Sequence, residues 1–202
     1  FLAKLGERRA HYVLTVSEFS KDRLTQVLGL NPDRIQVIPI GAKRFDTVGT
    51  AGGSPRPLEA DYLLHVGVLD KRKNLPALVE ALALIEDNSL HLVLVGGRPS
   101  KVFMDGYSEI VEMVHKHGLQ RRVHLMGYVA DERLAAYYLH ASAYVFPSSY
   151  EGFGIPVLEA YQYGLPLAAS SAASLPEVVG GGGLLFDPQD AVEMAQVITR
   201  LL

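Results

Sequence analysis

The sequence of 202 residues predicts an α/β protein with a doubly wound, six-stranded, mostly parallel Rossmann-like sheet. Two observations carry this prediction. Short apolar, β-branched runs alternate with helical patterns through most of the chain, and these runs lack a strict polar–apolar alternation. Continuous apolar strands are typical of a parallel sheet that helices cover on both faces. Right-handed crossovers between such strands produce the doubly wound topology.

The composition is that of a globular protein with a sizeable core. Hydrophobic residues make up 49% of the chain and charged residues 20%. The formal net charge of -3 gives no indication of nucleic acid or of an anionic membrane as a partner. The lack of cysteine excludes disulfide scaffolds, thiol nucleophiles and cysteine metal sites. No apolar run has the length of a membrane span, and the first residues lack the layout of a signal peptide.

The first predicted elements precede a segment of different composition. HYVLTVS at 11–17 predicts a strand, and Ser17 is the expected N-cap of a helix over 18–28. A second strand is expected at 35–41. The following stretch is rich in Gly, Ser, Thr and Pro without periodicity, which predicts a linker. The expected division is a first segment at 1–45, a linker at 46–60 and a larger domain at 61–202.

The larger domain is expected to contain six strands, each followed by a helix. The strands are predicted at 62–67, 90–97, 122–129, 143–148, 165–171 and 183–188. The helices are predicted near 74–86, 106–118, 131–140, from about 155, at 174–179 and from 189 onward. Ligands of open parallel sheets bind outside the carboxyl ends of the strands, so the turns at those ends are the candidate sites.

The first candidate turn, GVLDKRKN, has three cations immediately before the helix expected near Asn74. These are Lys71, Arg72 and Lys73. Cations beside the free N–H groups of a helix N-terminus suit a phosphate or a diphosphate. A short basic run is also common on a solvated loop, so both readings stay open for this segment alone.

The second candidate turn, VGGRPS, has the paired glycines Gly96 and Gly97 at the end of a strand. Paired glycines indicate that the backbone approaches another group closely. The segment lacks the G-x-G-x-x-G spacing of a dinucleotide site, and the chain has no G-x-x-x-x-G-K-[ST] motif. A tight turn therefore explains the glycines about as well as contact with a nucleotide base.

The segment most indicative of a ligand site is YEGFGIPVLE at 150–159. Gly152 and Gly154 open the backbone, and Pro156 is favoured at a first helical position. The N–H groups of 153–155 are therefore able to hold ligand oxygens.

Two carboxylates flank this helix start, Glu151 before it and Glu159 about one turn inside it. A carboxylate accepts well from two neighbouring hydroxyls, so a ribose diol is a natural partner for Glu159. The alternative is that Glu151 caps the helix and Glu159 pairs with an internal donor.

In combination, these segments resemble the C-terminal, donor-binding part of the family-4 retaining glycosyltransferases of the GT-B fold, with the tail of the N-terminal domain. The matching segments are TVSEFSKDRL (15–24), RIQVIPIGA (34–42), HVGVLDKRKNLPALVEAL (65–82), VHLMGYVADERLAAYY (123–138), VFPSSYEGFGIPVLEA (145–160) and GLPLAASSAASLPEVVGGGGLLFDP (164–188). They occur in the family's order over nearly the whole chain. One of them contains the family's E-x7-E pattern.

The resemblance implies a role for each matched position. Lys73 and Arg72 would contact the donor diphosphate, and Glu159 would bind the ribose hydroxyls. The residues implied to face the donor sugar and its phosphate are Glu151 and the backbone of Phe153, Gly154 and Ile155. Those implied in the phosphate segment and the base pocket are the backbone of Gly67, Gly96, Gly97, Gly127, Tyr128 and Val129.

The resemblance also implies the reaction. A hexosyl group such as mannose or glucose would pass from a GDP- or UDP-linked donor to a glycan or glycolipid acceptor, with retention and without a cofactor or an obligatory metal. A cytoplasmic location is expected, with peripheral association of the full-length protein at the inner membrane face. Two alternatives stay open: another GT-B sugar-nucleotide enzyme such as an epimerase, or a non-catalytic sugar-nucleotide-binding module.

Two features modify these expectations. Val68 stands where many relatives have an arginine, so Lys71 or Arg72 is expected to compensate for the missing charge. The chain does not begin with methionine, and it resembles only the tail of the acceptor domain, so we expect a fragment. Such a fragment is expected to bind a nucleotide sugar weakly and to show little or no transferase activity alone.

Overall fold

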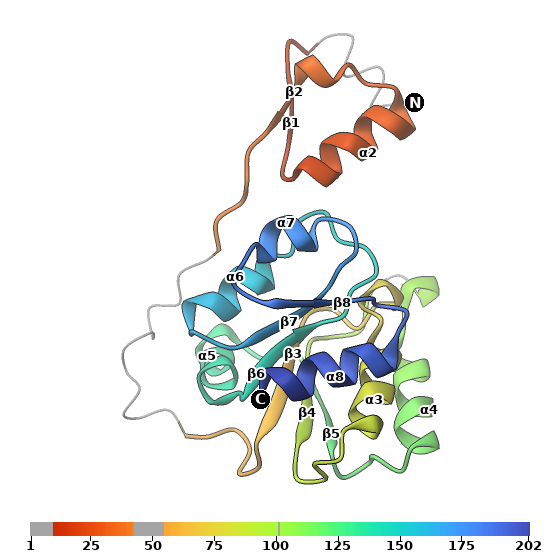
Figure 1. Ribbon diagram of the computed structural model, residues 1–202, viewed down its shortest axis with the longest axis vertical. Coiled ribbons are helices and arrows are strands. Elements are labelled where there is room, and N and C mark those ends of the chain that lie inside the picture. The colour runs from red at the N-terminus through yellow and green to blue at the C-terminus, as the bar shows by residue number, and fades with distance from the viewer. Residues whose placement is uncertain (1–9, 43–54, 101) are drawn as a thin grey trace.

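The computed structural model describes residues 10–42, 55–100 and 102–202 (Figure 1). A small unit at one end consists of β1 (Val13–Thr15), α2 (Glu18–Leu28) and β2 (Ile35–Val37), with the two strands parallel. The predicted helix over 18–28 is confirmed, and Ser17 is its N-cap, because the serine hydroxyl accepts from the N–H of Ser20. A 3₁₀ turn at Pro32–Arg34 precedes β2.

The main body is a six-stranded, all-parallel sheet, as the sequence predicts. Its strands are β3 (Tyr62–Val66), β4 (His91–Val95), β5 (Val123–Gly127), β6 (Ala143–Phe146), β7 (Leu167–Ser170) and β8 (Leu184–Phe186). The order in space is β5-β4-β3-β6-β7-β8. The direction of winding reverses between β3 and β6, which makes their carboxyl ends the topological switch point.

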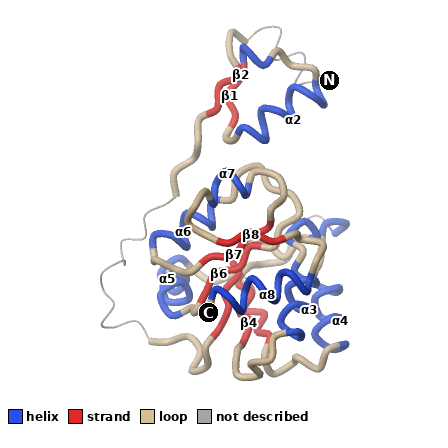
Figure 2. Tube along the Cα trace, viewed as in Figure 1, coloured by secondary structure: helices blue, strands red, loops and turns tan. Residues whose placement is uncertain are grey.

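Helices cover both faces of this sheet (Figures 1 and 2). One face carries α3 (Leu75–Leu84), α4 (Tyr107–Lys116) and α8 (Ala191–Leu201). The other face carries α5 (Asp131–His140), α6 (Ile155–Gln162) and α7 (Leu175–Val179). Short 3₁₀ turns follow β3 at Lys71–Lys73 and β4 at Val102–Met104.

Each face of the sheet has its own buried core. Leu63 and Val145 point into the core under α3, α4 and α8, whereas their neighbours Leu64 and Tyr144 point into the core under α5, α6 and α7. Successive side chains of one strand are therefore both buried. This double burial explains why the strands are continuous apolar runs in the sequence.

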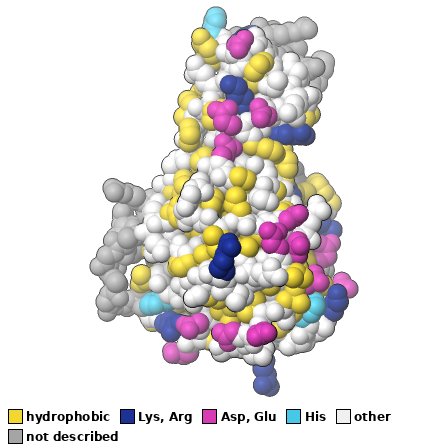
Figure 3. Space-filling view, viewed as in Figure 1, with side chains coloured by type: hydrophobic (Ala, Val, Ile, Leu, Met, Phe, Trp, Pro, Cys, Tyr) yellow, Lys and Arg dark blue, Asp and Glu magenta, His cyan; other side chains and the backbone are white. Residues whose placement is uncertain are grey.

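Part of the predicted linker, residues 46–54, lies outside the described residues. Residues 55–61 lead to β3 without a helix or strand. The division into 1–45, 46–60 and 61–202 stays a prediction. On the face drawn in Figure 3, acidic and basic side chains are interspersed. Within the part of the chain that the structure describes, no helix has the length and apolar character needed to cross a membrane.

Candidate active site

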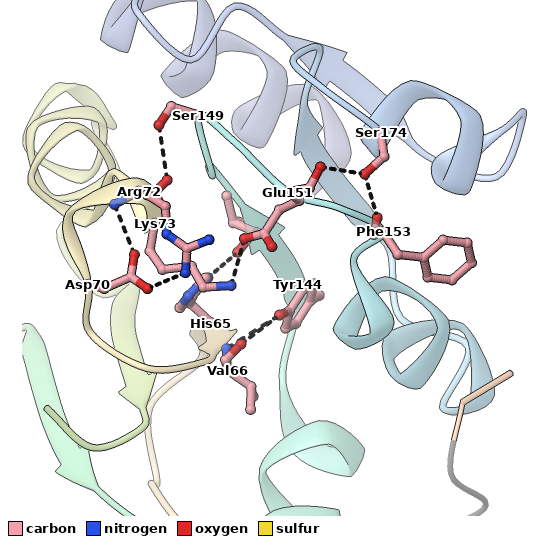
Figure 4. Close-up of polar contacts among 11 residues, drawn as sticks. His65, Val66, Asp70, Arg72, Lys73, Tyr144, Ser149, Glu151, Phe153 and Ser174 are labelled. Carbon is pink, nitrogen blue, oxygen red and sulfur yellow. Dashed lines mark hydrogen bonds and ion pairs between the residues drawn. The ribbon is translucent and has the colours of Figure 1, made fainter. Parts of the chain in front are cut away.

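The switch point brings the two most informative sequence segments together (Figure 4). Lys73, in the turn after β3, and Glu151, in the turn after β6, form an ion pair with 2.7 Å between Nζ and Oε1. Their side chains are only 11% and 13% exposed. The Lys73 ammonium also lies over the ring of Phe146, 4.8 Å from its centroid, which adds a cation–π attraction.

Glu151 does not cap the helix that follows it. The N-cap of α6 is Gly154, and no side chain makes a capping hydrogen bond there. The predicted helix start at Ile155 and Pro156 is confirmed. Because the first N–H groups of a helix carry partial positive charge, the α6 N-terminus adds to the capacity of this region for an anion.

Arg72 has a partner to which the sequence did not direct attention. Its Nη2 lies 2.6 Å from Oδ2 of Asp70, and its backbone N–H donates to Oδ1 of the same carboxylate. This bond to Asp70 raises the pKa of Arg72 above its usual value, and the charge of Glu151 adds to the shift. The available signal was an aspartate two residues before the arginine, a spacing typical of an Asx turn.

The three adjacent cations have different surroundings. Lys71 pairs with Glu109 of α4, at 2.7 Å between Nζ and Oε1, and is largely exposed. Arg72 lies near enough to Glu151 for that charge to raise its pKa. That Lys71 or Arg72 compensates for Val68 stays a prediction.

The turn that carries Glu151 is held in place by two serines (Figure 4). The hydroxyl of Ser174 lies 3.0 Å from each of the carbonyl oxygens of Glu151 and Phe153. Ser149 donates its backbone N–H to the carbonyl of Arg72 at 2.8 Å, which ties this turn to the basic segment. Ser174 is also the N-cap residue of α7, but its side chain makes no capping hydrogen bond there.

Glu159 lies on α6, partly buried, and accepts a hydrogen bond from the hydroxyl of Tyr138 at 2.7 Å. The internal donor that the sequence left open therefore exists. It occupies one carboxylate oxygen, Oε2. A second acceptor oxygen remains in the carboxylate, so an internal bond and a ligand role are compatible.

The predicted base-pocket residues lie at the adjacent ends of three strands. Gly67 follows β3 and donates its N–H to Val95, while Gly96 follows β4 and donates to Gly127 at the end of β5. The carbonyl of Gly97 accepts from Leu69. Tyr128 and Val129 follow Gly127 in the chain. Tyr128 is 83% exposed, and Val129 is half-buried. The structure brings these positions to one sheet edge, and their roles stay predictions.

A buried histidine lies beside the ion pair. His65 of β3 donates from Nδ1 to the carbonyl of Val145 at 3.0 Å and stacks against Phe146. Burial, together with the nearby charge of Lys73, lowers the pKa of His65 to about 3. The imidazole is therefore neutral at physiological pH.

This histidine makes stability depend on pH. Its folded pKa of about 3 lies below the usual histidine value of 6.5, so between these values the unfolded chain binds more protons and stability falls as pH falls. We expect His65→Asn to reduce the loss of unfolding free energy between pH 7 and pH 5 by about 2 kcal/mol. Urea unfolding at both pH values measures this difference.

His115→Asn, at an exposed position of α4, is the matched control and should keep the wild-type dependence on pH. An unchanged dependence in His65→Asn would show that His65 is not the buried neutral group responsible.

A cavity of about 480 Å³ adjoins this site between the small unit and the main body. It is lined by Thr15, Ser20, Arg23, Leu24, Val27, Leu28, Tyr150 and Gly152. The hydroxyl of Ser17 donates to the carbonyl of Gly152 at 2.7 Å, and the carboxylate of Glu177 accepts from the first N–H groups of α2. Among the described residues, no group of three or more His, Asp or Glu side chains is placed to hold a metal ion.

Curated relatives match almost the whole chain. The O-antigen chain mannosyltransferase B of Escherichia coli is 33% identical over 205 residues, covering 96% of this chain and 52% of its own length. The O-antigen chain mannosyltransferase RfbU of Salmonella typhimurium is 30% identical over 201 residues, covering 100% of this chain and 54% of its own. The chain thus spans about half the length of these two relatives.

Solved structures have the same fold. Sucrose-phosphate synthase from Thermosynechococcus elongatus superposes with a TM-score of 0.78 at 29% identity, over 95% of this chain and 49% of its own. Anabaena HepE in complex with UDP and glucose superposes with a TM-score of 0.82 at 23% identity, over 98% of this chain and 55% of its own. These matches confirm the C-terminal Rossmann-like domain of a GT-B fold, as the resemblance implied.

A family model described as "Glycosyl transferases group 1" matches residues 52–202. That range contains the six-stranded sheet, the Lys73–Glu151 pair and Glu159. The chain therefore belongs to the glycosyl transferases group 1 family.

Proposed function

We propose that this chain is the donor-binding part of a retaining hexosyltransferase that uses a nucleotide-diphosphate sugar. The observation that carries the proposal is the nearly buried Lys73–Glu151 pair at the switch point, beside the α6 N-terminus that no side chain caps. Glu159 lies on the same helix. Cation, helix N-terminus and carboxylate are the groups that a diphosphate and a ribose require.

In this proposal, each part of the donor has its own contacts. Lys73 and Arg72, with the N–H groups of Gly154 and Ile155, hold the diphosphate. Glu159 accepts from the ribose hydroxyls, and Glu151 faces the sugar. The glycine backbone at the ends of β3, β4 and β5 borders the base.

The chemistry follows from stabilising the leaving group. The bond between the anomeric carbon and the diphosphate oxygen breaks, and its electron pair stays on the diphosphate. A bond to the acceptor oxygen forms on the same face of the sugar, and the proton of the acceptor hydroxyl passes to the departing diphosphate oxygen. Lys73, Arg72 and the helix N-terminus stabilise the departing charge, so we propose that no cofactor and no obligatory metal are required.

Relatives support a particular donor and acceptor class. Two of them are named O-antigen chain mannosyltransferases, and a third, from Mycolicibacterium hassiacum, is named an MMP alpha-(1->4)-mannosyltransferase. We therefore propose mannose as the hexose, GDP or UDP as the nucleotide, and a glycan or lipid-linked glycan as the acceptor. The cavity beside Tyr150 is a route for the acceptor. A cytoplasmic location, with the full-length protein at the inner membrane face, is part of the same proposal.

A thermal-shift panel of GDP, UDP, ADP, their nucleosides and the matching nucleotide sugars tests this function. At about ten times its Kd, the preferred nucleoside diphosphate is expected to raise Tm by about 3 °C. The matching nucleoside, which lacks the diphosphate, should shift Tm less. No shift with any of these compounds at millimolar concentration would contradict the proposed function.

A further inference from the structure

The ribose-binding carboxylate of the proposed function is held by a buried tyrosine. Tyr138 lies on α5, has no exposed surface, and donates its hydroxyl to Oε2 of Glu159 at 2.7 Å. Its ring stacks on Tyr163, with 5.3 Å between centroids and 6° between planes, and on Tyr144 at 5.8 Å. These contacts fix the phenol in one orientation, so its hydroxyl is a rigid donor.

The phenol has the correct chemistry for this position. Burial, with the charge of Glu159 among the further causes, raises the pKa of Tyr138, so the hydroxyl keeps its proton. A carboxylate accepts through about four lone-pair positions. The bond from Tyr138 occupies one of them, so positions remain for both hydroxyls of a ribose.

We propose that Tyr138 is a positioning residue, which holds the Glu159 carboxylate ready for the ribose diol and so makes the site prefer ribonucleotides over deoxynucleotides. This inference rests on the proposed function. A glutamate side chain loses rotamer freedom when it binds a ligand. A carboxylate that Tyr138 already orders loses less of this freedom on binding. The smaller entropy loss strengthens the binding only of ligands whose hydroxyls contact Glu159.

The alternative role for Tyr138 is packing alone, because it belongs to the core under α5, α6 and α7. The two roles differ in a measurable way. A packing defect lowers the affinity for every nucleotide alike. A positioning defect lowers only the affinity that depends on the ribose hydroxyls.

The test compares Tyr138→Phe, which keeps the ring and its stacking, with the wild-type chain. Isothermal titration measures the Kd of the preferred nucleoside diphosphate and of its 2′,3′-dideoxy form. We expect the Kd of the ribonucleotide to rise by about tenfold, because the Glu159 side chain then has more rotamer freedom to lose on binding, and the Kd of the dideoxy form to stay unchanged.

Tyr161→Phe is the matched control. Tyr161 lies on α6 like Glu159, but its hydroxyl donates to the carbonyl of Val179 at 2.8 Å. Its removal should leave the ratio of the two Kd values at the wild-type level.

Glu159→Gln separates failure of this inference from failure of the proposed function. If Glu159→Gln lowers the preference for the ribonucleotide and Tyr138→Phe does not, the positioning role is wrong and the ribose role of Glu159 stands. An equal loss of both ligands in Tyr138→Phe would show a packing role only. If Glu159→Gln leaves the preference unchanged, or if neither nucleotide binds the wild-type chain, both the assigned ribose contact and this inference are wrong.

Discussion

Replacing Gly96 with alanine is expected to destabilise the protein by about 3 kcal/mol or more, at the upper end of single substitutions. A Cβ at this position would lie 1.8 Å from the carbonyl oxygen of Gly67, and Gly96 has a φ of +151°, which side chains rarely adopt. The obstacle is backbone held by its own hydrogen bonds, because Gly67 donates to Val95 and the next turn is tied through Leu69 to Gly97. The ends of β3 and β4 would have to separate.

Gly97→Ala is the control for this prediction. Nothing lies within 4 Å of a Cβ at Gly97, so the change in unfolding free energy should stay below about 1 kcal/mol. Urea unfolding at neutral pH measures both variants. Equal stabilities of the two would contradict the close approach of β3 and β4.

Gly96 also shows which part of a contact can be predicted from the sequence and which part needs the structure. Paired glycines after a strand indicate a close approach of the backbone, and that inference is confirmed for Gly96 but not for Gly97. The sequence could not identify the approaching group, which is the carbonyl of Gly67, 29 positions earlier in the chain. Strand pairing decides that contact, and it depends on tertiary structure.

The fold itself was predictable because each strand is buried on both faces. Neighbouring residues such as Leu63 and Leu64 enter opposite cores, so the apolar runs are continuous and easy to recognise. The spatial order of the strands was not predicted. It places the reversal of winding between β3 and β6, and this is why Lys73 and Glu151 meet across 78 positions.

Within the site, the sequence identified residue types but not their individual surroundings. Lys71, Arg72 and Lys73 are equivalent in the pattern. They form a 3₁₀ turn, in which successive side chains point about 120° apart. Lys71 therefore reaches Glu109 and only Lys73 is buried against Glu151. The contact of Tyr138 with Glu159 likewise depends on how α5 packs beside α6.

Replacing Lys73 with methionine has the second large expected effect. Methionine keeps an apolar side chain beside Phe146 but removes the ammonium that pairs with Glu151. We expect the affinity for a nucleoside diphosphate to fall by about hundredfold, because a charge-assisted contact to the phosphate is lost. We also expect a loss of about 1–3 kcal/mol in stability, because Glu151 is left nearly buried without its partner.

Two further variants separate these effects. Lys73→Met combined with Glu151→Gln should recover much of the stability, since no unpaired carboxylate remains, without recovering the affinity. Lys71→Met removes a cation from the same turn, but one that is exposed and paired with Glu109. Its affinity for the nucleotide should stay within about twofold of the wild-type value.

The most direct test of whether the diphosphate binds at the switch point is isothermal titration. The ligand is the nucleoside diphosphate that gives the largest thermal shift, and the chains compared are the wild type, Lys73→Met and Lys71→Met. A hundredfold weaker Kd for Lys73→Met, with Lys71→Met close to wild type, is the predicted result. Binding by Lys73→Met as tight as that of the wild-type chain would place the diphosphate elsewhere and contradict the proposed site.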